Sequence, residues 1–345
     1  MVERRVTIAV VGDGVDELDI ALLDALHLNP LATFEELGTL LDIAPVTAGR
    51  RWRRLVSTGR AWVSSAPGPQ LPLRAALFEA ECRPGAASAV ADEFAALPQV
   101  FSVNITTGQD DVYAFVIAGD QPLLAELLVD RLPSVAGLNR VQSALMTQLF
   151  SGTRWRLGGL SPDQVRAVTP EPAKTTPAHE FDEFDRELFL ALQRDGRLSF
   201  RELAAAVGRP EPTVRRRMGL LAHAGMLAFR TDFARVQAGW PTAVALKLSV
   251  TGSTVAEVGR TLVRYPETRF CVAVTGGGAA DIFVTMQLHQ VSDLDPVIHR
   301  LSAEHQGVAV LDTRVVLRSV KSWGRLLGLD GRAQDVVPVD LWAPV

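Results

Sequence analysis

The sequence predicts an α+β fold in which two three-helix units alternate with two βαββαβ units along a chain of 345 residues. Two observations predict it: the chain repeats itself at a nearly constant offset, and each copy changes from helical to strand periodicity at the same point. With 48% hydrophobic and 21% charged residues, the composition is that of a globular protein. A chain of this length is expected to form two to four domains rather than one core.

The repeat is the strongest signal in the chain. Residues 18–55 align without gaps with residues 184–221. Identical residues stand 166 positions apart at several points, among them Asp19 and Asp185, Phe34 and Phe200, Thr47 and Thr213, and Arg50 and Arg216. Agreement of this length in a fixed register indicates an internal duplication.

Each copy begins with a pattern typical of three helices. The first helix carries apolar residues at helical spacing, Leu22, Leu23 and Leu26 in one copy and Leu188, Phe189 and Leu192 in the other. The second opens with a capping box, Thr33 with Glu36 or Ser199 with Glu202. A short turn leads to a basic third helix. This order predicts a helix-turn-helix, whose last helix fits a DNA major groove.

The third helices set a basic face against an apolar one. In "EPTVRRRMGLLAHAG" (211–225), Val214, Met218 and Leu221 form one apolar stripe. In the first copy, Ala48, Trp52 and Leu55 are expected inside, and Arg50, Arg53, Arg54 and Ser57 outside. A single basic run is usually a solvated helix face. The same pattern at the same register in both copies favours DNA recognition instead. Contact with double-stranded DNA is predicted for Thr47, Arg50, Arg51, Arg53, Arg54, Thr213, Arg215, Arg216 and Arg217.

A second pattern follows each helical unit in the order strand, helix, two hairpin strands, helix, strand. It runs from "TAVALKLSV" to "VAVLDTRVVLRSV" in the second copy and from "RAALFEAEC" to "NRVQSALMTQLF" in the first. The offset rises from 168 to 170 across the hairpin, so the second copy has two extra residues in that loop. The βαββαβ order predicts a ferredoxin-like sheet with helices on one face and a bare face suited to pairing.

These patterns divide the chain as follows. We expect helix-turn-helix domains at 15–65 and, winged, at 181–235, ferredoxin-like regulatory domains at 72–150 and 240–322, a linker rich in proline and polar residues at 158–180, and a C-terminal tail at 323–345. The tail has no counterpart in the first copy, so it is expected either to dock or to be disordered.

At this point the chain resembles the Lrp/AsnC (feast/famine) family of transcription regulators, fused in tandem. The motifs that carry the resemblance are residues 184–227 and the hairpin "VTGGGAADIFV" at 274–284, with equivalents at 18–63 and 106–116. The resemblance implies two winged helix-turn-helix domains, two regulatory domains that dimerise through their sheets, and an amino-acid-like effector. The first copy departs from the second in having Leu31 instead of an arginine and Gly49 within its third helix.

The resemblance also places the effector near the hairpin loop. Three glycines leave backbone N–H groups open to a carboxylate, and an aspartate could pair with an α-ammonium group; a plain hairpin turn explains the glycines equally well. The predicted effector residues are Thr275, Gly276, Gly277, Gly278 and Asp281, with Thr107, Gly108 and Asp111 in the first copy. Since the first loop has fewer glycines and more acid, the second is the favoured site.

Other function classes are disfavoured. Siroheme decarboxylases also use tandem Lrp/AsnC-like units, so an enzyme is one alternative, and an effector-sensing module without DNA binding is another. The histidines show no metal or acid–base spacing, and no metal, cofactor or enzymatic activity is expected. The apolar run from Val6 to Val11 is too short for a signal peptide or a membrane span. We expect a cytoplasmic protein without membrane contact that forms a homodimer or higher oligomer.

Overall fold

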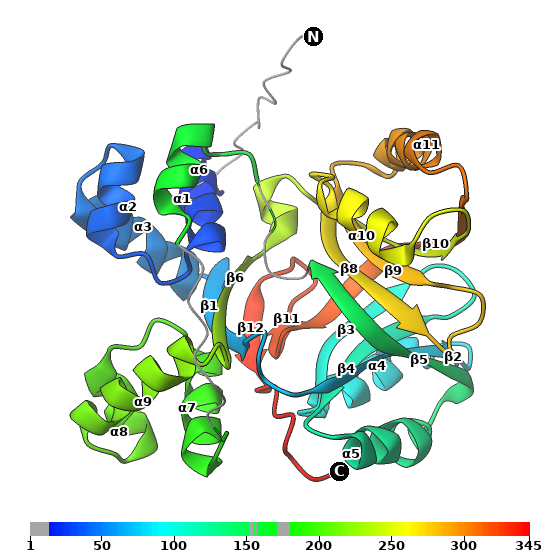
Figure 1. Ribbon diagram of the computed structural model, residues 1–345, viewed down its shortest axis with the longest axis horizontal. Coiled ribbons are helices and arrows are strands. Elements are labelled where there is room, and N and C mark those ends of the chain that lie inside the picture. The colour runs from blue at the N-terminus through cyan, green and yellow to red at the C-terminus, as the bar shows by residue number, and fades with distance from the viewer. Residues whose placement is uncertain (1–13, 152–154, 156, 171–179) are drawn as a thin grey trace.

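A computed structural model describes residues 14–151, 155, 157–170 and 180–345. The two helical units lie on one side of the molecule and the two sheets with their covering helices on the other (Figure 1). The apolar run near the N-terminus lies outside the described residues. Among the described residues, no helix has both the length and the apolar character needed to cross a bilayer.

The helical units form as the repeat predicts. The first consists of α1 (Glu17–Leu28), α2 (Phe34–Leu41) and α3 (Pro45–Ser57), and the second of α7 (Glu183–Arg194), α8 (Phe200–Val207) and α9 (Glu211–His223). Both predicted capping boxes are present, at the starts of α2 and α8. The expected inward residues of α3 are buried, and so are Val214 and Leu221 of α9. The glycine within α3 packs on Phe34, which leaves little room for a larger side chain.

The wings of the two helical units pair with each other rather than folding back on their own unit. Strands β1 (Ala61–Pro67) and β6 (Leu227–Phe233) form a two-stranded antiparallel sheet. Helix α7 packs on β1 and helix α1 packs on β6, so each unit lies against the wing of the other. The two helix-turn-helix units are therefore joined as one body.

The regulatory units have the predicted βαββαβ order. The first contains β2 (Arg74–Cys82), α4 (Ala87–Ala96), β3 (Val100–Thr106), β4 (Val112–Ala118), α5 (Gln121–Glu126) with a π-helical turn (Leu127–Arg131), and β5 (Leu138–Ser151). The second contains β7 (Thr242–Val250), α10 (Val255–Val263), β8 (Thr268–Thr275), β9 (Ile282–Leu288), α11 (Leu294–Glu304) and β10 (Val308–Ser322). The thiols of Cys82 and Cys271 are both buried and free.

The two regulatory sheets close into one barrel within the chain. Strand β5 pairs with β8 of the other half, β10 pairs with β3, and the remaining pairings lie within each half. Side chains of alternating residues therefore point either to the outer helices or into the barrel. The bare faces expected to pair do so within the chain.

A buried ionic network joins the two halves inside the barrel. Glu79 of β2 forms ion pairs with Lys247 of β7 at 2.6 Å and with Arg314 of β10 at 2.8 Å. Arg314 also pairs with Asp110, in the loop between β3 and β4, at 2.8 Å. The carboxylate of Glu79 is 1% exposed, so its charge depends on these partners. The acids that hold Arg314 thus come largely from the first copy and the cations from the second.

The linker and the tail both contain ordered structure. Within the predicted linker lies the short helix α6 (Pro162–Val168), which packs on α1 and α2. The tail forms β11 (Arg325–Leu327) and β12 (Ala333–Val336) and then docks on α7. There Trp342 stacks on Phe181 and Asp340 pairs with Arg186 at 2.5 Å. The tail docks, as one of the two expected alternatives, and each helical unit is held by the segment that follows its own regulatory unit.

Candidate nucleic-acid interface and ligand cavity

The arginines of α3 divide between solvent and structure. Arg50 and Arg53 are exposed, as a DNA contact requires. Arg54 was expected to project outward, and this expectation is wrong. It is only 35% exposed and forms an ion pair with the buried Asp19 of α1. The acid lies on a neighbouring helix, so the periodicity of α3 alone could not reveal the pair.

Arg51 and Arg217 occupy equivalent positions and form equivalent ion pairs. Arg51 contacts Asp16 at 2.7 Å and Asp19 at 2.9 Å. Arg217 contacts Asp182 at 2.9 Å and Asp185 at 3.4 Å. In both units the arginine binds the acids at the start of the first helix. Against the opposing effect of burial, the pKa of Asp16 is lowered chiefly by Arg51, and the pKa of Asp182 by the backbone N–H of Asp185 together with Arg217. Both arginines therefore fix the third helix to the first.

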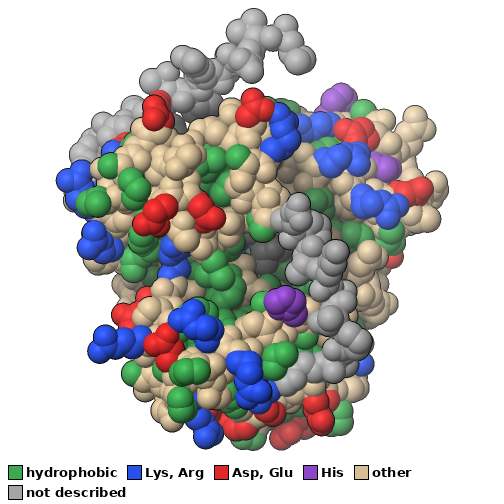
Figure 2. All heavy atoms as spheres, turned by 60° about the vertical axis from the view of Figure 1, so that its left-hand side comes forward, with side chains coloured by type: hydrophobic (Ala, Val, Ile, Leu, Met, Phe, Trp, Pro, Cys, Tyr) green, Lys and Arg blue, Asp and Glu red, His purple; other side chains and the backbone are tan. Residues whose placement is uncertain are grey.

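The remaining cations of α9 are exposed. Arg215 pairs with Glu211 at 2.7 Å and lies over the ring of Phe200 at 4.3 Å. Arg216 is exposed and makes no ion pair within the described part of the chain. Thr47 and Thr213, near the helix starts, are half-buried. The face that carries both helical units shows Lys and Arg side chains interspersed with acids (Figure 2). Arg50, Arg53 and Arg216 are thus the cations best placed for DNA.

A contact between the two helical units fixes their separation. Arg197, in the turn before α8, donates hydrogen bonds of 2.7 Å to the backbone carbonyls of Pro30 and Ala32. Its guanidinium also lies 5.1 Å from the centre of the Phe34 ring. This arginine, absent from the first copy, binds the turn that precedes α2. Together with the β1–β6 sheet, it holds the two third helices at a set spacing.

The two hairpin loops predicted to bind an effector are exposed and packed against the opposite half. Gly276 and Gly278 have φ angles of 94° and 81°, which a glycine turn requires. Gly277 lies so close to Ala144 of β5 that a Cβ would come within 2.7 Å of it. The carboxylate of Asp281 accepts a hydrogen bond of 2.8 Å from the backbone N–H of Val250. Asp281 therefore has a structural role in the hairpin.

The first-copy loop repeats this arrangement. Asp111 accepts from the backbone N–H of Cys82 at 2.7 Å, which is the equivalent contact to that of Asp281. Thr107 exchanges hydrogen bonds with Val315 of β10. Gly108 packs against the side chain of Arg314. The loop residues thus hold the two halves of the barrel together, and their role as effector ligands stays a prediction.

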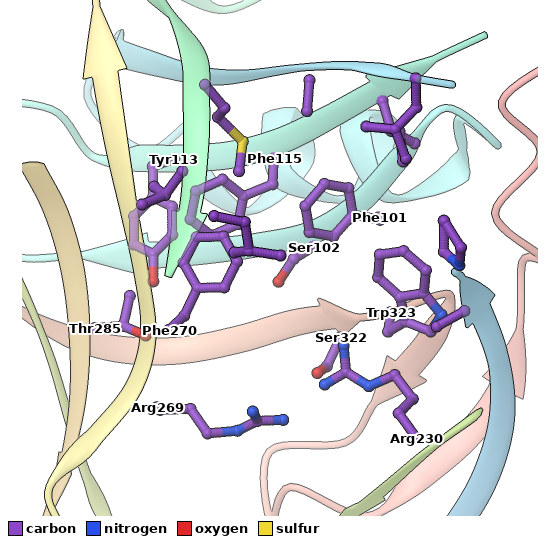
Figure 3. Close-up of a pocket in the computed structure, with 18 of the residues that line it drawn as sticks. Phe101, Ser102, Tyr113, Phe115, Arg230, Arg269, Phe270, Thr285, Ser322 and Trp323 are labelled. Atoms are coloured by element: carbon purple, nitrogen blue, oxygen red, sulfur yellow. The ribbon is translucent and has the colours of Figure 1, made fainter. Parts of the chain in front are cut away.

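A cavity of about 880 Å³ opens between the barrel and the two-stranded β1–β6 sheet, here called the wing sheet. Its walls come from the barrel strands, from β1 and β6, and from the turn after β10. One wall is aromatic and the opposite wall is cationic (Figure 3). The residues that define it are Phe101, Tyr113, Phe115, Phe270 and Trp323 on the aromatic side and Arg230, Arg235 and Arg269 on the cationic side.

The cationic wall is built around one aspartate. Asp232, on β6, is fully buried and accepts from Arg235 at 2.7 Å and Arg230 at 3.0 Å, with Arg269 at 3.5 Å. The hydroxyl of Ser322 also donates to it at 3.2 Å. Three guanidinium groups therefore surround a single carboxylate. Within the described residues this leaves the wall with more positive than negative charge.

The pKa values reflect this crowding. Burial would raise the pKa of Asp232, but the charges of Arg235, Arg269 and Arg230 outweigh it and hold the pKa below the usual range. Burial, with the repulsion of its neighbours, lowers the pKa of Arg269 to about 9. Burial also raises the pKa of Tyr113 above its ordinary value. At neutral pH this cavity is suited to binding anions.

The arginine cluster was not predicted from the sequence. Arg230 and Asp232 stand among apolar residues in "LAFRTDF", and Arg269 is the second residue of the mostly apolar strand "TRFCVAVT". Charged residues inside buried strand patterns are a usable signal, since such residues are rarely buried without a partner or ligand. Arg269 lies in a different segment from Arg230 and Arg235, however, and only the folded chain brings it to Asp232.

The comparisons with known proteins agree with this architecture. An AsnC-type helix-turn-helix domain matches residues 15–56 and 181–221, and an Lrp/AsnC ligand binding domain matches residues 75–155 and 243–326. The chain has the fold of a two-unit regulator with a helix-turn-helix domain and a ligand-binding domain in each unit. It belongs to the Lrp/AsnC family of transcription regulators.

Its curated relatives correspond to one unit of this chain. An uncharacterised HTH-type transcriptional regulator of Pyrococcus horikoshii is 32% identical over 146 residues, which are 42% of this chain and 90% of the relative. The HTH-type transcriptional regulator FL11 of Pyrococcus abyssi is 27% identical over 141 residues, or 41% of this chain and 91% of the relative. The chain therefore contains two copies of what these proteins have once.

A solved structure covers both units. The siroheme decarboxylase NirDL superposes with a TM-score of 0.58 and 14% identity over 89% of this chain and 93% of its own. A structure of the same enzyme in complex with an iron-uroporphyrin III analogue gives a TM-score of 0.55 with 15% identity. At this level of identity the similarity establishes the tandem fold and leaves the activity open.

Proposed function

We propose that the chain is a sequence-specific DNA-binding transcription regulator that uses its two helix-turn-helix units as a fixed pair. The observation that carries the proposal is the joint presence of exposed arginines on both third helices and of a rigid connection between them. The β1–β6 sheet and the hydrogen bonds of Arg197 supply that connection. Two such helices at a set spacing are what a double-stranded site with two half-sites requires.

The test compares exposed arginines on the third helices with exposed arginines elsewhere. Replacing Arg50, Arg53 and Arg216 with alanine should weaken binding to promoter DNA that the wild type binds, by roughly 1–3 kcal/mol for each arginine that binds a base. Each arginine that binds a phosphate should, when replaced, also reduce the salt dependence by a slope of about 0.9. The matched control replaces Arg83 and Arg260, which are exposed outside the helical units. Equal affinity of both variants at two salt concentrations would refute DNA binding by these helices.

We infer that the regulator responds to a small molecule bearing a carboxylate. The sequence places an amino-acid effector at Thr275–Asp281, and calorimetric titration with amino acids tests that site. Asp281→Ala should abolish such binding while removing only one backbone hydrogen bond from the hairpin. Binding that survives this change would place the ligand elsewhere. The three arginines of the cavity offer stronger support for a carboxylate than the loop does.

We propose regulation rather than catalysis. The ionisable side chains that line the cavity in the described residues are arginines and Tyr113. Arginine stays protonated at neutral pH, so this lining favours binding over proton transfer. Because the fold resembles a siroheme decarboxylase, anaerobic incubation with siroheme followed by mass spectrometry is the direct test. Loss of carbon dioxide from siroheme would overturn the proposal.

We also propose that the chain assembles into a homodimer or a higher oligomer. Within the barrel, the inner sheet faces are already packed together and the edge strands β3, β5, β8 and β10 are already paired. A second chain would therefore have to bind to the outer helices or to the helical units. Light scattering at micromolar concentration should give a mass above the 37.3 kDa of one chain. A mass equal to one chain would refute assembly.

A further inference from the structure

The cavity is too large and too polarised to be a packing defect. Its volume of about 880 Å³ lies at the upper end of ligand sites, which usually run from about 300 to 1,000 Å³. A free amino acid would fill only a small part of it. The space is therefore large enough for a ligand of considerable size.

The cationic wall indicates the charge of that occupant. Arg230 and Arg235 each keep a buried Nε–H without a hydrogen-bond partner among the described residues. Arg230 is 9% exposed and lines the cavity. A buried, unpaired donor of this kind carries a desolvation penalty, which an anionic ligand would remove. Arg230 and Arg235 can therefore each donate a hydrogen bond to a carboxylate of a ligand.

The aromatic wall indicates the shape of the occupant. The rings of Phe101 and Phe115 stack at 5.5 Å with an angle of 14° between their planes. Phe270 lies 4.7 Å from Phe115, and Trp323 lies 4.9 Å from Phe101. Figure 3 shows the three phenylalanine rings gathered on one side of the space, opposite Arg269, with Trp323 beside Arg230. Flat rings of this kind favour a planar aromatic ligand, which gains by offset stacking.

Trp323 ties the aromatic wall to the wing sheet. Its φ angle of 46° is unfavourable for a bulky residue, and such conformations cluster at ligand sites. Its indole N–H donates a hydrogen bond of 2.8 Å to the backbone carbonyl of Ser65 on β1. Arg230 on β6 lies over the same ring at 5.4 Å. Both strands that join the helix-turn-helix units are therefore in contact with the cavity wall.

We propose that this cavity binds a large, planar aromatic dicarboxylate. Its carboxylates lie on Arg230 and Arg235, with Arg269 behind them, and its ring lies along Phe101 and Phe115. Such a ligand touches the barrel and both wing strands at once, so its presence alters the spacing of the two helical units. The regulatory meaning of the ligand rests on the proposed function, whereas binding to the cavity does not.

Protoporphyrin IX is a suitable probe, because it is planar and apolar and has two carboxylates on one edge. Its dimethyl ester has the same ring without charge. Hexadecanedioate has two carboxylates on a flexible chain, and phenylalanine represents an amino acid. Titration of the full chain with each probe, followed by absorbance and calorimetry, should give one tight site for protoporphyrin IX. The three other probes should bind at least tenfold more weakly.

The key variant replaces Arg230 and Arg235 with glutamine. Arg269 and Ser322 still contact Asp232 in this variant, so the aspartate keeps partners. Affinity for protoporphyrin IX should fall at least about 100-fold, as expected when two buried ion pairs with the ligand are removed. The matched control is Arg260→Gln, an exposed arginine on α10, which should bind as the wild type does. The midpoint of thermal unfolding of each variant reports that it is folded.

The outcomes separate cleanly. Equal affinity of the wild type and the double variant would overturn the proposed site. Tighter binding of hexadecanedioate than of protoporphyrin IX would overturn the planar ring, and absence of binding by every probe would overturn the ligand class. The Arg50, Arg53 and Arg216 triple-alanine variant should bind protoporphyrin IX normally. Failure of DNA binding and failure of ligand binding are therefore distinguishable.

Discussion

The two halves of the chain fold alike but contribute opposite chemistry to the cavity. Phe101 of β3 and Arg269 of β8 occupy equivalent positions, 168 residues apart, and one gives a ring where the other gives a charge. Ser64 and Arg230 are likewise equivalent and pair directly across the wing sheet. A dimer of identical chains would have to place the same residue at both positions. Duplication within one chain allows each half to specialise.

The barrel interior shows the same asymmetry in its charges. Glu79 and Lys247 stand at equivalent positions of β2 and β7 and pair with each other. If two first halves met, two glutamates would face each other; if two second halves met, two lysines would. Either arrangement leaves buried charges unpaired, at a cost of several kcal/mol. The difference between the halves thus selects the pairing within one chain.

Removing this charge pair should have the largest effect on stability. Glu79→Ala deprives Lys247 of its buried partner and leaves Arg314 with fewer acids, so we expect a loss of about 3–5 kcal/mol of unfolding free energy. Urea unfolding followed by circular dichroism measures it. The control is Glu81→Ala on the same strand, whose partner Arg140 is 42% exposed and whose loss should cost about 1 kcal/mol or less. Similar effects of the two substitutions would contradict a special role for the buried pair.

The second prediction concerns a histidine that only one half has. His27 on α1 is buried against Phe233, and its equivalent on α7 is Gln193. Burial, together with the nearby Arg269 and Arg235 and against the attraction of Asp232, lowers the pKa of His27 from 6.5 to about 4. Between these pH values the unfolded chain binds more protons than the folded one. Stability from this residue is therefore complete above pH 6.5 and is lost as the pH falls toward 4.

The loss attributable to His27 should reach about 3 kcal/mol at low pH, because each pKa unit corresponds to about 1.4 kcal/mol. His27→Gln installs the residue of the second half and should remove this part of the pH dependence. His299→Gln, an exposed histidine on α11, is the control. Urea midpoints measured from pH 7.5 to 4.5 give the comparison. Parallel curves for the wild type and His27→Gln would show that the imidazole does not govern acid stability.

Features that depend on local sequence could be predicted, and features that depend on distant partners could not. Capping boxes and apolar stripes are formed by residues only a few positions apart in the sequence. The starts of α2 and α8 and the buried stripe of α3 were therefore predictable. The partner of Arg54 lies 35 residues upstream on another helix. The periodicity of α3 shows only which of its side chains point away from the core, not what they contact. The cavity depends on barrel closure, which brings β6 beside β8 and the turn after β10. Residues with several distant partners are therefore the ones that the sequence could not reveal.

The smallest predicted effect tests the contact between the helical units. Arg197→Leu installs the residue found at the equivalent position, Leu31, and removes two hydrogen bonds to backbone carbonyls. We expect a loss of about 1–2 kcal/mol, expressed as faster amide hydrogen exchange in α2 and α3 while the barrel strands are unchanged. The reciprocal change, Leu31→Arg, alters a side chain that is 47% exposed and should be close to neutral. Unchanged exchange in Arg197→Leu would show that the wing sheet alone holds the pair.

If the protein binds DNA as proposed, the wing sheet gives the molecule a direction along it. Regulators built from two identical chains have a two-fold axis, and the sites they read are palindromes. Here β1–β6 joins two unlike third helices: where α3 has Arg53, α9 has Gly219. If both helices enter the same groove, the protein binds a site in one orientation and in the reverse orientation with different affinity. Each promoter could then be approached from one side only, so that the orientation of a gene, and not just its presence, would be part of what is read.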